Sequence, residues 1–475
     1  HGQLEAAIHH ALAAGDTSAA AQLLATLVSP LLHQGDLVSV QGWLERLPAA
    51  EVLANPRLCL TQVWVLLDAY HLAEAAPFLN QLRTYIGATD EAALHAEMLA
   101  ILAVASAMEH RPAAALTLAR SAEEAAASSA SVLPYVAFGL GAAYRMSYEP
   151  VRAEEAFRQA AAGAAAQCNH YIAGSAWGNL AALYLETGRL ADAERAHERL
   201  LQLLRIAPGV EKPDAGLNYL ELARIYYERN RLDAAATALE RSIRLCSEWE
   251  NYQALVRAQL VQSQLFQARR AFAEAQNTLE AADHHARQSA DPQLVQSVIR
   301  RWVALALAQG ERSRAQQWAE RLSTDGPYTF LTGLTLARLA LAGDEPGRAL
   351  DYLTGCWQQI AKLPLFAVQV HTLALQALAH AALRQSNQAN RLLQQALNMG
   401  QSSGLVRTLI DLGAALETLL RTAPISPAVT MWPNCSVRWP ASALIQLPAG
   451  SRRANRRSSI CWPPVFPTAR WPSGW

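Results

Sequence analysis

A short pattern recurs along most of this sequence: a turn followed by a helix with an alanine near its start. It reads His71-Leu-Ala-Glu-Ala75 early in the chain, Arg189-Leu-Ala-Asp-Ala193 in the middle and Ser386-Asn-Gln-Ala389 late. The spacing between successive anchor alanines is 34 to 42 residues and most often 40. A period near 40 is typical of an array of helical hairpins. The anchors are Ala75, Ala115, Ala153, Ala193, Ala235, Ala275, Ala315, Ala349 and Ala389.

Each repeat predicts two helices, as 172–186 and 190–204 illustrate. The first helix carries Trp177, Leu180 and Tyr184 on one face, and Gly188 ends the pattern. The small anchor residue lets the second helix approach closely. A single hairpin cannot bury its apolar face, so neighbouring hairpins must stack into a continuous core.

The units resemble tetratricopeptide repeats (TPR), in which a large aromatic residue, Leu-Ala, Tyr and Gly precede an alanine of the second helix. The usual repeat is about 34 residues long, so most units here are longer. No strand pattern occurs in 1–422. We therefore predict an all-α, TPR-like α-solenoid with an irregular C-terminal tail. The expected domains are leading helices in 1–50, the repeat superhelix in 51–422 and the tail in 423–475.

The first fifty residues fit the repeat less well than the rest. Two helices, 4–14 and 17–34, are expected on either side of Gly15-Asp16, with Asp16 as an N-cap. A third, 37–47, should end before Pro48.

The composition favours a folded protein of the reducing cytoplasm. Lys and Arg total 40 and so do Asp and Glu, so overall charge indicates neither a nucleic-acid nor a membrane partner. The six cysteines form no CxxC pair, and no apolar run approaches the roughly 20 residues that span a bilayer. No secretory signal is visible.

The sequence contains no recognisable catalytic or metal-binding motif. It lacks a P-loop, a Gly-x-Ser-x-Gly elbow and an HExxH motif. The two histidine pairs, His9-His10 and His284-His285, point about 100° apart on a helix and read as surface residues. We predict no enzyme activity, no metal and no cofactor in this chain.

Three early stretches together resemble one family. They are 5–16 (Glu-Ala-Ala-Ile-His-His-Ala-Leu-Ala-Ala-Gly-Asp), 43–48 (Trp-Leu-Glu-Arg-Leu-Pro) and 55–60 (Asn-Pro-Arg-Leu-Cys-Leu) followed by Trp64. They are similar to the start of the helical-repeat region in large ATP-binding LuxR-family regulators of the MalT-like type, and the resemblance extends over about 1–422. It implies an upstream ATP-binding domain, a C-terminal helix-turn-helix, and an array that receives the inducing signal and takes part in self-association. Since the chain begins at His1 without Met, we expect it to be a fragment.

The tail differs from the rest in composition. Residues 423–475 hold nine of the 22 Pro, five of the 12 Trp and six Arg, with no acidic residue, which leaves a net charge of −6 in 1–422. It reads as a disordered tail, as a basic aromatic arm for nucleic acid, or, as we prefer, as an out-of-frame stretch. Trp is TGG and Pro is CCN, so both Trp462-Pro463 and Trp471-Pro472 give alanine in the shifted frame. With permitted codons, 453–475 then resembles the opening of a LuxR-type helix-turn-helix, with the slip near 427–430.

A ligand surface is expected on the first helices, which should line the concave face of the stack. Six residues should point away from their hairpin partners: Tyr135, Phe138, Arg145, Glu186, Arg224 and Tyr227. Mixed aromatic and charged groups suit a small polar effector, and a merely solvated groove is the alternative.

These patterns predict the effector-sensing and protein-interaction scaffold of a LuxR-family regulator. Its partners would be a small-molecule effector or a protein in the groove, with self-association as a further possibility. As translated, the chain should not bind DNA specifically. A free-standing TPR-type adaptor that binds a protein segment is the alternative, and an enzyme on a helical scaffold is disfavoured.

Overall fold

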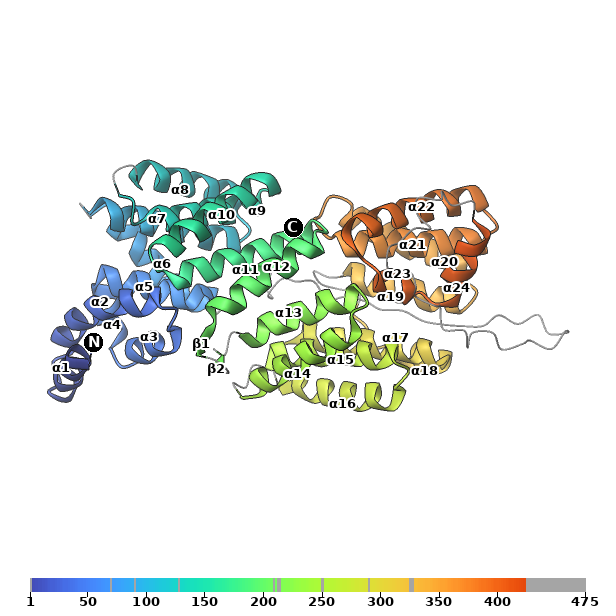
Figure 1. Ribbon diagram of the computed structural model, residues 1–475, viewed down its shortest axis with the longest axis horizontal. Coiled ribbons are helices and arrows are strands. Elements are labelled where there is room, and N and C mark those ends of the chain that lie inside the picture. The colour runs from blue at the N-terminus through green and yellow to red at the C-terminus, as the bar shows by residue number, and fades with distance from the viewer. Residues whose placement is uncertain are drawn as a thin grey trace. The chain divides into compact units, whose positions relative to one another are not determined.

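The computed structural model describes residues 2–68, 71–88, 91–126, 129–207, 210–211, 215–248, 252–288, 291–323 and 329–423. It confirms an all-α solenoid of repeated helical hairpins (Figure 1). One small departure from the strand-free prediction is an antiparallel pair of short strands, β1 (Arg205–Ala207) and β2 (Val210–Glu211), after α12. The tail from 424 onward, where the frame shift is predicted, lies outside the described residues.

The helices fall into two compact units, one ending at Leu183 and one beginning at Tyr184, so that the division lies within α11. Unit 1 contains α1 (Gly2–Ala13), α2 (Thr17–His33), α3 (Leu37–Leu44), α4 (Ala49–Ala54), α5 (Pro56–Asp68), α6 (Leu72–Ile86), α7 (Ala92–Met108), α8 (Pro112–Ala125), α9 (Leu133–Met146), α10 (Pro150–Ala166) and most of α11 (His170–Glu186).

Unit 2 continues the same alternation of first and second helices. It contains α12 (Leu190–Leu203), α13 (Ala215–Glu228), α14 (Leu232–Glu248), α15 (Tyr252–Ala268), α16 (Phe272–Gln288), α17 (Pro292–Gln309), α18 (Arg312–Ala319), α19 (Thr329–Ala342), α20 (Pro346–Ile360), α21 (Phe366–Ala382), α22 (Ser386–Ser403), α23 (Arg407–Ile410) and α24 (Ala414–Thr422).

Local signals explain where the helices begin. The Asp16 carboxylate accepts the Ala19 N–H at 2.9 Å and starts α2, as predicted. Asp36 does the same for α3, accepting the Ser39 N–H at 3.2 Å. Each aspartate satisfies a backbone donor that the helix itself leaves unpaired.

The nine anchor alanines all lie on second helices, from α6 to α22, and all are 0% exposed. A methyl side chain at these positions lets the two helices of a hairpin approach closely. A larger residue would force the helices apart, so the repeated alanine sets the hairpin geometry.

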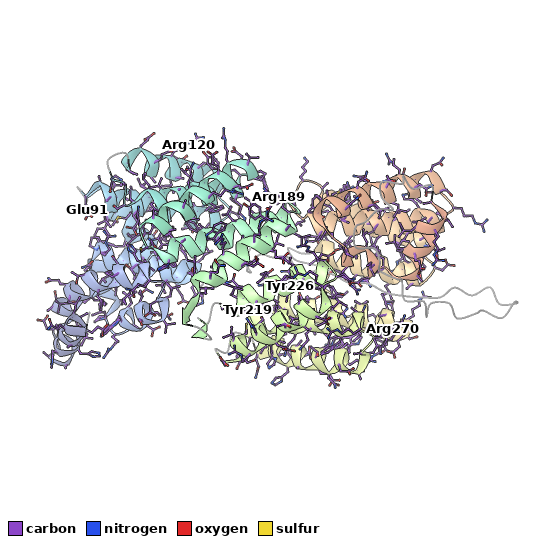
Figure 2. The ribbon with its side chains drawn as sticks, in the orientation of Figure 1. Glu91, Arg120, Arg189, Tyr219, Tyr226 and Arg270 are labelled. Carbon is purple, nitrogen blue, oxygen red and sulfur yellow. The ribbon has the colours of Figure 1, made fainter. Side chains whose placement is uncertain are left out.

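The turns within hairpins use one residue of left-handed backbone. Gly188 has φ 75° and Asn230 has φ 59°, a region that favours Gly and Asn. The next arginine stacks on a tyrosine of the first helix: the Arg189 guanidinium lies 4.5 Å from the centre of the Tyr184 ring, and that of Arg231 lies 4.5 Å from the centre of the Tyr226 ring. Figure 2 labels one residue of each pair, Arg189 and Tyr226. The predicted helix stop at Gly188 is therefore confirmed, since α11 ends at Glu186.

Candidate functional site

Unit 1 contains a buried aromatic cluster around Trp64 of α5. Its ring centre lies 5.7 Å from that of Tyr135, 6.1 Å from that of Phe138 and 5.8 Å from that of Tyr171. All four side chains are buried. The cluster joins α5, α9 and α11, so the aromatic residues of this region act as core between successive repeats.

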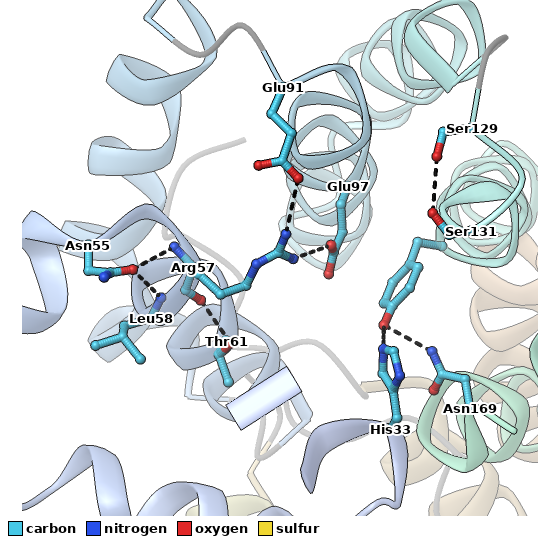
Figure 3. A network of polar contacts seen from close by, with 11 residues as sticks. His33, Asn55, Arg57, Leu58, Thr61, Glu91, Glu97, Ser129, Ser131 and Asn169 are labelled. Carbon is cyan, nitrogen blue, oxygen red and sulfur yellow. Dashed lines mark hydrogen bonds and ion pairs between the residues drawn. The ribbon is translucent and has the colours of Figure 1, made fainter. Parts of the chain in front are cut away.

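Hydrogen bonds fix the Tyr135 hydroxyl at the edge of this cluster. It lies 2.9 Å from His33 Nε2 of α2, and the Asn169 side-chain amide donates to it at 2.9 Å (Figure 3). Asn169 also accepts the Ile172 N–H at 3.1 Å at the start of α11. Burial, aided by Arg57, lowers the pKa of His33, so the imidazole is neutral near pH 7.

An ion pair lies beside the aromatic cluster. Arg57 Nη1 of α5 donates to Glu97 Oε2 of α7 at 2.8 Å, and a second contact joins Arg57 to Glu91 at 3.7 Å (Figure 3). Burial raises the pKa of Glu97, and Arg57 opposes that rise. Asn55 accepts the backbone N–H groups of Arg57 and Leu58 and so fixes the first turn of α5.

Three of the predicted ligand residues lie in unit 1. Tyr135 and Phe138 come together on Trp64, but both are buried. Phe138 does not point away from its hairpin partner as expected, because its ring also packs on Phe157 of α10, at 5.7 Å. Arg145 is partly exposed and donates to Asn179 Oδ1 at 3.0 Å. Their role in binding a ligand stays a prediction.

In unit 2, first helices of successive hairpins pack side by side in the order α13, α15, α17, α19 and α21. The short helix α23 contacts both α13 and α21, the two ends of this row. The row therefore curves around α23, and we call the side that faces α23 the inner face. Most buried polar side chains of the described part of unit 2 belong to these first helices, among them Arg224, Glu228, Gln264, Gln267, Arg301, Thr335, Arg338 and His371.

Residues 405–412, which include α23, cross the inner face; we call them the inner segment. The segment binds through its own main chain: the Val406 N–H donates to the Glu228 carbonyl at 3.0 Å, and the Thr408 N–H donates to Glu228 Oε1 at 2.7 Å. Three apolar side chains of the segment are buried as well: Leu405, Leu409 and Leu412.

A charged contact joins the same segment to the end of α13. The Tyr227 hydroxyl donates to Asp411 Oδ2 at 2.9 Å. Arg407 pairs with Asp411 and places its guanidinium 5.2 Å from the Tyr227 ring centre. Burial raises the pKa of Asp411, whereas Arg407, the Tyr227 hydroxyl, Arg301 and Arg338 lower it.

Two titratable groups beside the segment are held neutral. Burial raises the pKa of Glu228 to about 8, although its hydrogen bonds to Thr408 oppose the rise. The second oxygen of Glu228, Oε2, has no hydrogen-bond partner among the described residues. Burial, reinforced by Arg338, lowers the pKa of His371 to about 3. The segment thus rests on a neutral acid and a neutral imidazole.

A second polar cluster is centred on Glu221, about two turns earlier on α13. Glu221 accepts from Arg224 at 2.8 Å and from Arg257 of α15 at 2.8 Å. Despite burial, the two arginines lower the pKa of Glu221 below its usual value. The carboxylate therefore stays ionised and ties two first helices together.

The other three predicted ligand residues lie in unit 2 and are buried. Arg224 belongs to the Glu221 cluster and Tyr227 to the inner segment contact, while Glu186 lies at the end of α11. The structure therefore divides the six predicted residues between the two units, and their role as ligand residues stays a prediction.

Sequence reasoning missed Glu228, Arg407 and Asp411. The only signal was the spacing of Arg407 and Asp411 by four residues, which is typical of an ordinary helix-surface ion pair. Glu228 follows two tyrosines in the sequence, and nothing there indicates its contact with Thr408.

Within the described ranges, no group of three His, Cys, Asp or Glu side chains could hold a metal ion. None of the described helices is both long and apolar enough to cross a membrane.

Residues 96–425 match the family model described as "MalT-like TPR region". Among solved structures, a Rap protein complexed with competence and sporulation factor is 12% identical, with a TM-score of 0.55 over 74% of this chain and 99% of that one. The apo form of RapI is 11% identical, with a TM-score of 0.55, and the match covers 73% of this chain and 99% of that one. A signal transduction ATPase with numerous domains and a TPR sensor, from Pyrococcus horikoshii, is 12% identical, with a TM-score of 0.48 over 70% of this chain and 53% of that one. At these identities the two Rap structures show a common fold.

Proposed function

Because this chain belongs to the family of MalT-like TPR regions, we propose that it is the effector-sensing and protein-interaction part of a cytoplasmic LuxR-family transcription regulator. In this role it has no catalytic activity of its own. ATP binding and specific DNA binding belong to other domains of the regulator. The family and the helical-repeat fold support a sensing or interaction scaffold, and the resemblance of 5–60 to such regulators supplies the context of transcription.

The observation that carries the proposal is the occupied inner face of unit 2. This face holds the inner segment through two backbone hydrogen bonds. The Val406 N–H donates to the Glu228 carbonyl, and the Thr408 N–H donates to the Glu228 side chain. In addition, the Tyr227 hydroxyl on this face donates a hydrogen bond to the Asp411 carboxylate of the segment. A surface that binds main chain and a charged side chain together is suited to a protein segment or a polar effector.

The fold comparison supports this proposal. One Rap neighbour was solved as a complex with the competence and sporulation factor, so the fold carries a ligand in that protein. The alternative is a free-standing TPR-type adaptor, which the same inner face also supports.

Sequencing the genomic DNA on both sides of the coding region separates these two functions. The regulator predicts a P-loop coding region upstream of His1, and a helix-turn-helix in the frame shifted by one base near 427–430. If both are missing, the adaptor is the better proposal.

A titration on promoter DNA at physiological salt tests the DNA-binding part of the proposal. One protein is the chain as given, and the other has the frame restored near 427–430 and is extended through a complete helix-turn-helix. Base contacts specify sequence, so only the restored protein should bind specifically. The six tail arginines should give the chain as given no more than weak, salt-sensitive attraction. Specific binding by the chain as given would overturn the frame-shift interpretation.

A further inference from the structure

We propose that the inner segment, residues 405–412, is a clasp that closes the row of first helices in unit 2, and that its release from α13 is the switching step of the sensor. This inference rests on the proposed function, because it takes the inner face as the surface that receives the effector. It adds how that surface is regulated. The chain has a closed state, with the segment on α13, and an open state in which this contact is broken.

The position of the inner segment suits a clasp. α13 and α21 are the two end helices of the row, with α15, α17 and α19 between them, and α23 of the segment contacts both ends. The segment therefore joins two helices that are separated by three others. If the row opens and its end helices move apart, the segment has to leave one of them.

One side of the segment is fixed on α21 and α22. The segment begins two residues after the end of α22, and the Leu405 N–H donates to the Gly400 carbonyl at 2.9 Å. The Leu409 side chain also packs at Gly400, where a Cβ would lie 3.2 Å from Leu409 Cδ1. Beyond the segment, α24 contacts α21. Chain continuity and apolar packing thus keep the segment on this side of the row.

The other side is attached to α13 by hydrogen bonds. Two backbone N–H groups of the segment donate to Glu228, and the Tyr227 hydroxyl donates to Asp411. Water can replace each of these bonds once the segment moves away, so the net stability that each one adds is small. The ion pair of Arg407 with Asp411 lies within the segment and moves with it. Opening therefore breaks the attachment to α13 first.

Two glycines with left-handed backbone flank the segment. Gly404, the C-cap of α22, has φ 79°, and Gly413, the N-cap of α24, has φ 71°. Glycine changes between regions of backbone conformation at less steric cost than other residues. A Cβ at Gly404 would meet nothing within 4 Å, so the chain there has room to turn. The two glycines therefore allow the segment to move as a unit.

Glu228 links release of the segment to pH. Burial in the closed state raises its pKa to about 8, so the carboxyl group is protonated near neutral pH. When the segment leaves, water reaches this carboxyl group, its pKa falls toward 4.5 and it ionises. Opening therefore releases a proton, and a rise in pH from 6.5 to 8 favours the open state.

The other groups around this contact do not reverse that dependence. The charged and titratable ones are Arg407 and Asp411 of the segment, Tyr227 of α13, Arg301 of α17, Arg338 of α19 and His371 of α21. Burial raises the pKa of Asp411, so this group acts in the same direction as Glu228. Burial lowers the pKa of His371, which acts in the opposite direction but only below pH 6.5.

Native-state hydrogen exchange of the full chain, read by mass spectrometry, tests the clasp. α15, which lies within the row, serves as the reference. If the segment opens on its own, exchange of 405–412 should depend only weakly on low denaturant, because little surface is exposed, whereas exchange of α15 should rise steeply. If 405–412 exchange only together with α15, the segment is a fixed part of the fold and the proposal is wrong.

The same measurement at pH 6.5 and 8 tests the role of Glu228. After correction for the intrinsic exchange rate, opening of 405–412 should increase about tenfold in the wild type and much less in Glu228→Gln. The control Glu248→Gln, at an exposed position of α14, should behave as the wild type does. An equal increase in the wild type and Glu228→Gln would contradict the coupling of release to this carboxyl group.

Reporter transcription by the complete regulator, with no effector added, tests the switching step. Asp411→Asn removes the charge that meets Tyr227 and leaves α13 unaltered, so it weakens the closed state. Because the segment covers the inner face, an effector of that face favours the open state, and opening should imitate it. We expect transcription to rise about fivefold or more in Asp411→Asn. The control Asp351→Asn, at an exposed position of α20, should stay at the wild-type level.

Transcription at the wild-type level in Asp411→Asn, at a normal amount of protein, would overturn the switching step. If the restored chain still binds promoter DNA specifically, the regulator itself stands and only the clasp is wrong. If the genomic DNA encodes neither a P-loop nor a helix-turn-helix, the proposed function fails whatever the exchange measurements show. Should Asp411→Asn not fold, exchange in the wild type and Glu228→Gln decides the proposal.

Discussion

Tyr227 and Asp411 are 184 residues apart in the sequence, and a hydrogen bond of 2.9 Å joins their side chains. Tyr227 lies near the end of α13, the first hairpin helix after the short strands of unit 2, and Asp411 follows α23, close to the last described residues. This contact brings the two ends of the array of unit 2 together around one buried carboxylate. The inner segment therefore contacts both ends of the row of first helices, since α23 meets α13 as well as α21.

Removing the hydroxyl from this pair should destabilise unit 2. We expect Tyr227→Phe to lower the free energy of unfolding by about 1–3 kcal/mol, because a hydrogen bond to a buried carboxylate is lost while the ring remains. The control is Tyr226→Phe, whose ring keeps its contact with Arg231. Denaturant unfolding of both variants measures the difference. Equal stability of the two variants would contradict the role given to the Tyr227 hydroxyl.

Glu228 should make stability depend on pH. Burial raises its pKa to about 8 in the folded chain, above the usual 4.5, so folding binds a proton. The resulting stability is complete below pH 4.5 and is lost as the pH rises toward 8. His371, with a pKa lowered to about 3, acts in the opposite direction and only below pH 6.5. Between pH 6.5 and 8 we therefore expect a loss of about 2 kcal/mol.

Glu228→Gln tests this assignment, because glutamine keeps the acceptor for Thr408 and cannot ionise. The difference in unfolding free energy between variant and wild type should grow from pH 6.5 to 8. The nearby charges of Arg407 and Asp411 are common to both proteins. A difference that does not change with pH would show that Glu228 does not titrate in this range.

The anchor alanines should not tolerate larger side chains. Ala193 of α12 is fully buried, so Ala193→Leu should overpack its hairpin and cost about 1–3 kcal/mol. Ala191 is exposed two positions earlier on the same helix, and Ala191→Leu should change stability little. Thermal unfolding of the two variants makes the comparison. If Ala193→Leu is as stable as the wild type, the anchor position does not require a small side chain for the two helices of the hairpin to pack.

Gly141 of α9 allows close contact within its hairpin. A Cβ there would lie 2.6 Å from the Phe157 ring of α10. Gly141→Ala should therefore cost about 1–3 kcal/mol. In contrast, a Cβ at Gly355 of α20 meets nothing within 4 Å, and Gly355→Ala should stabilise the chain by up to about 1 kcal/mol. Denaturant unfolding of both variants measures the two changes in stability. A loss for Gly141→Ala together with a gain for Gly355→Ala would support the close contact at Gly141 and the open space at Gly355.

Much of the fold could be predicted from the sequence because local rules determine it. Ala193 marks the close approach in its hairpin, Gly188 supplies a left-handed turn, and Asp16 caps a helix. Each signal lies within a few residues of the structure that it specifies. The additional helix 49–54 and the strands 205–207 and 210–211 lack such signals and were not predicted.

The contacts of the candidate site could be predicted only in part. Helical periodicity placed Tyr227 on a first helix, but it could not indicate that the inner segment brings Asp411 against the Tyr227 hydroxyl. Likewise, Tyr135 was predicted as a groove residue, and Trp64 from a distant helix buries it. Periodicity gives the direction of a side chain relative to its own helix, whereas its surroundings depend on segments far away in the sequence.

The central claim is that the inner face of unit 2 receives the signal for a transcription regulator. The most direct measurement is reporter transcription driven by the complete regulator in its own host, over a panel of sugars and peptides. Arg224→Ala, which breaks a buried pair with Glu221, is compared with Arg244→Ala, which breaks an exposed pair with Glu248. The account predicts an inducing condition whose response is lost in Arg224→Ala and kept in Arg244→Ala. Responses that stay unchanged in Arg224→Ala, at a normal protein level, would contradict it.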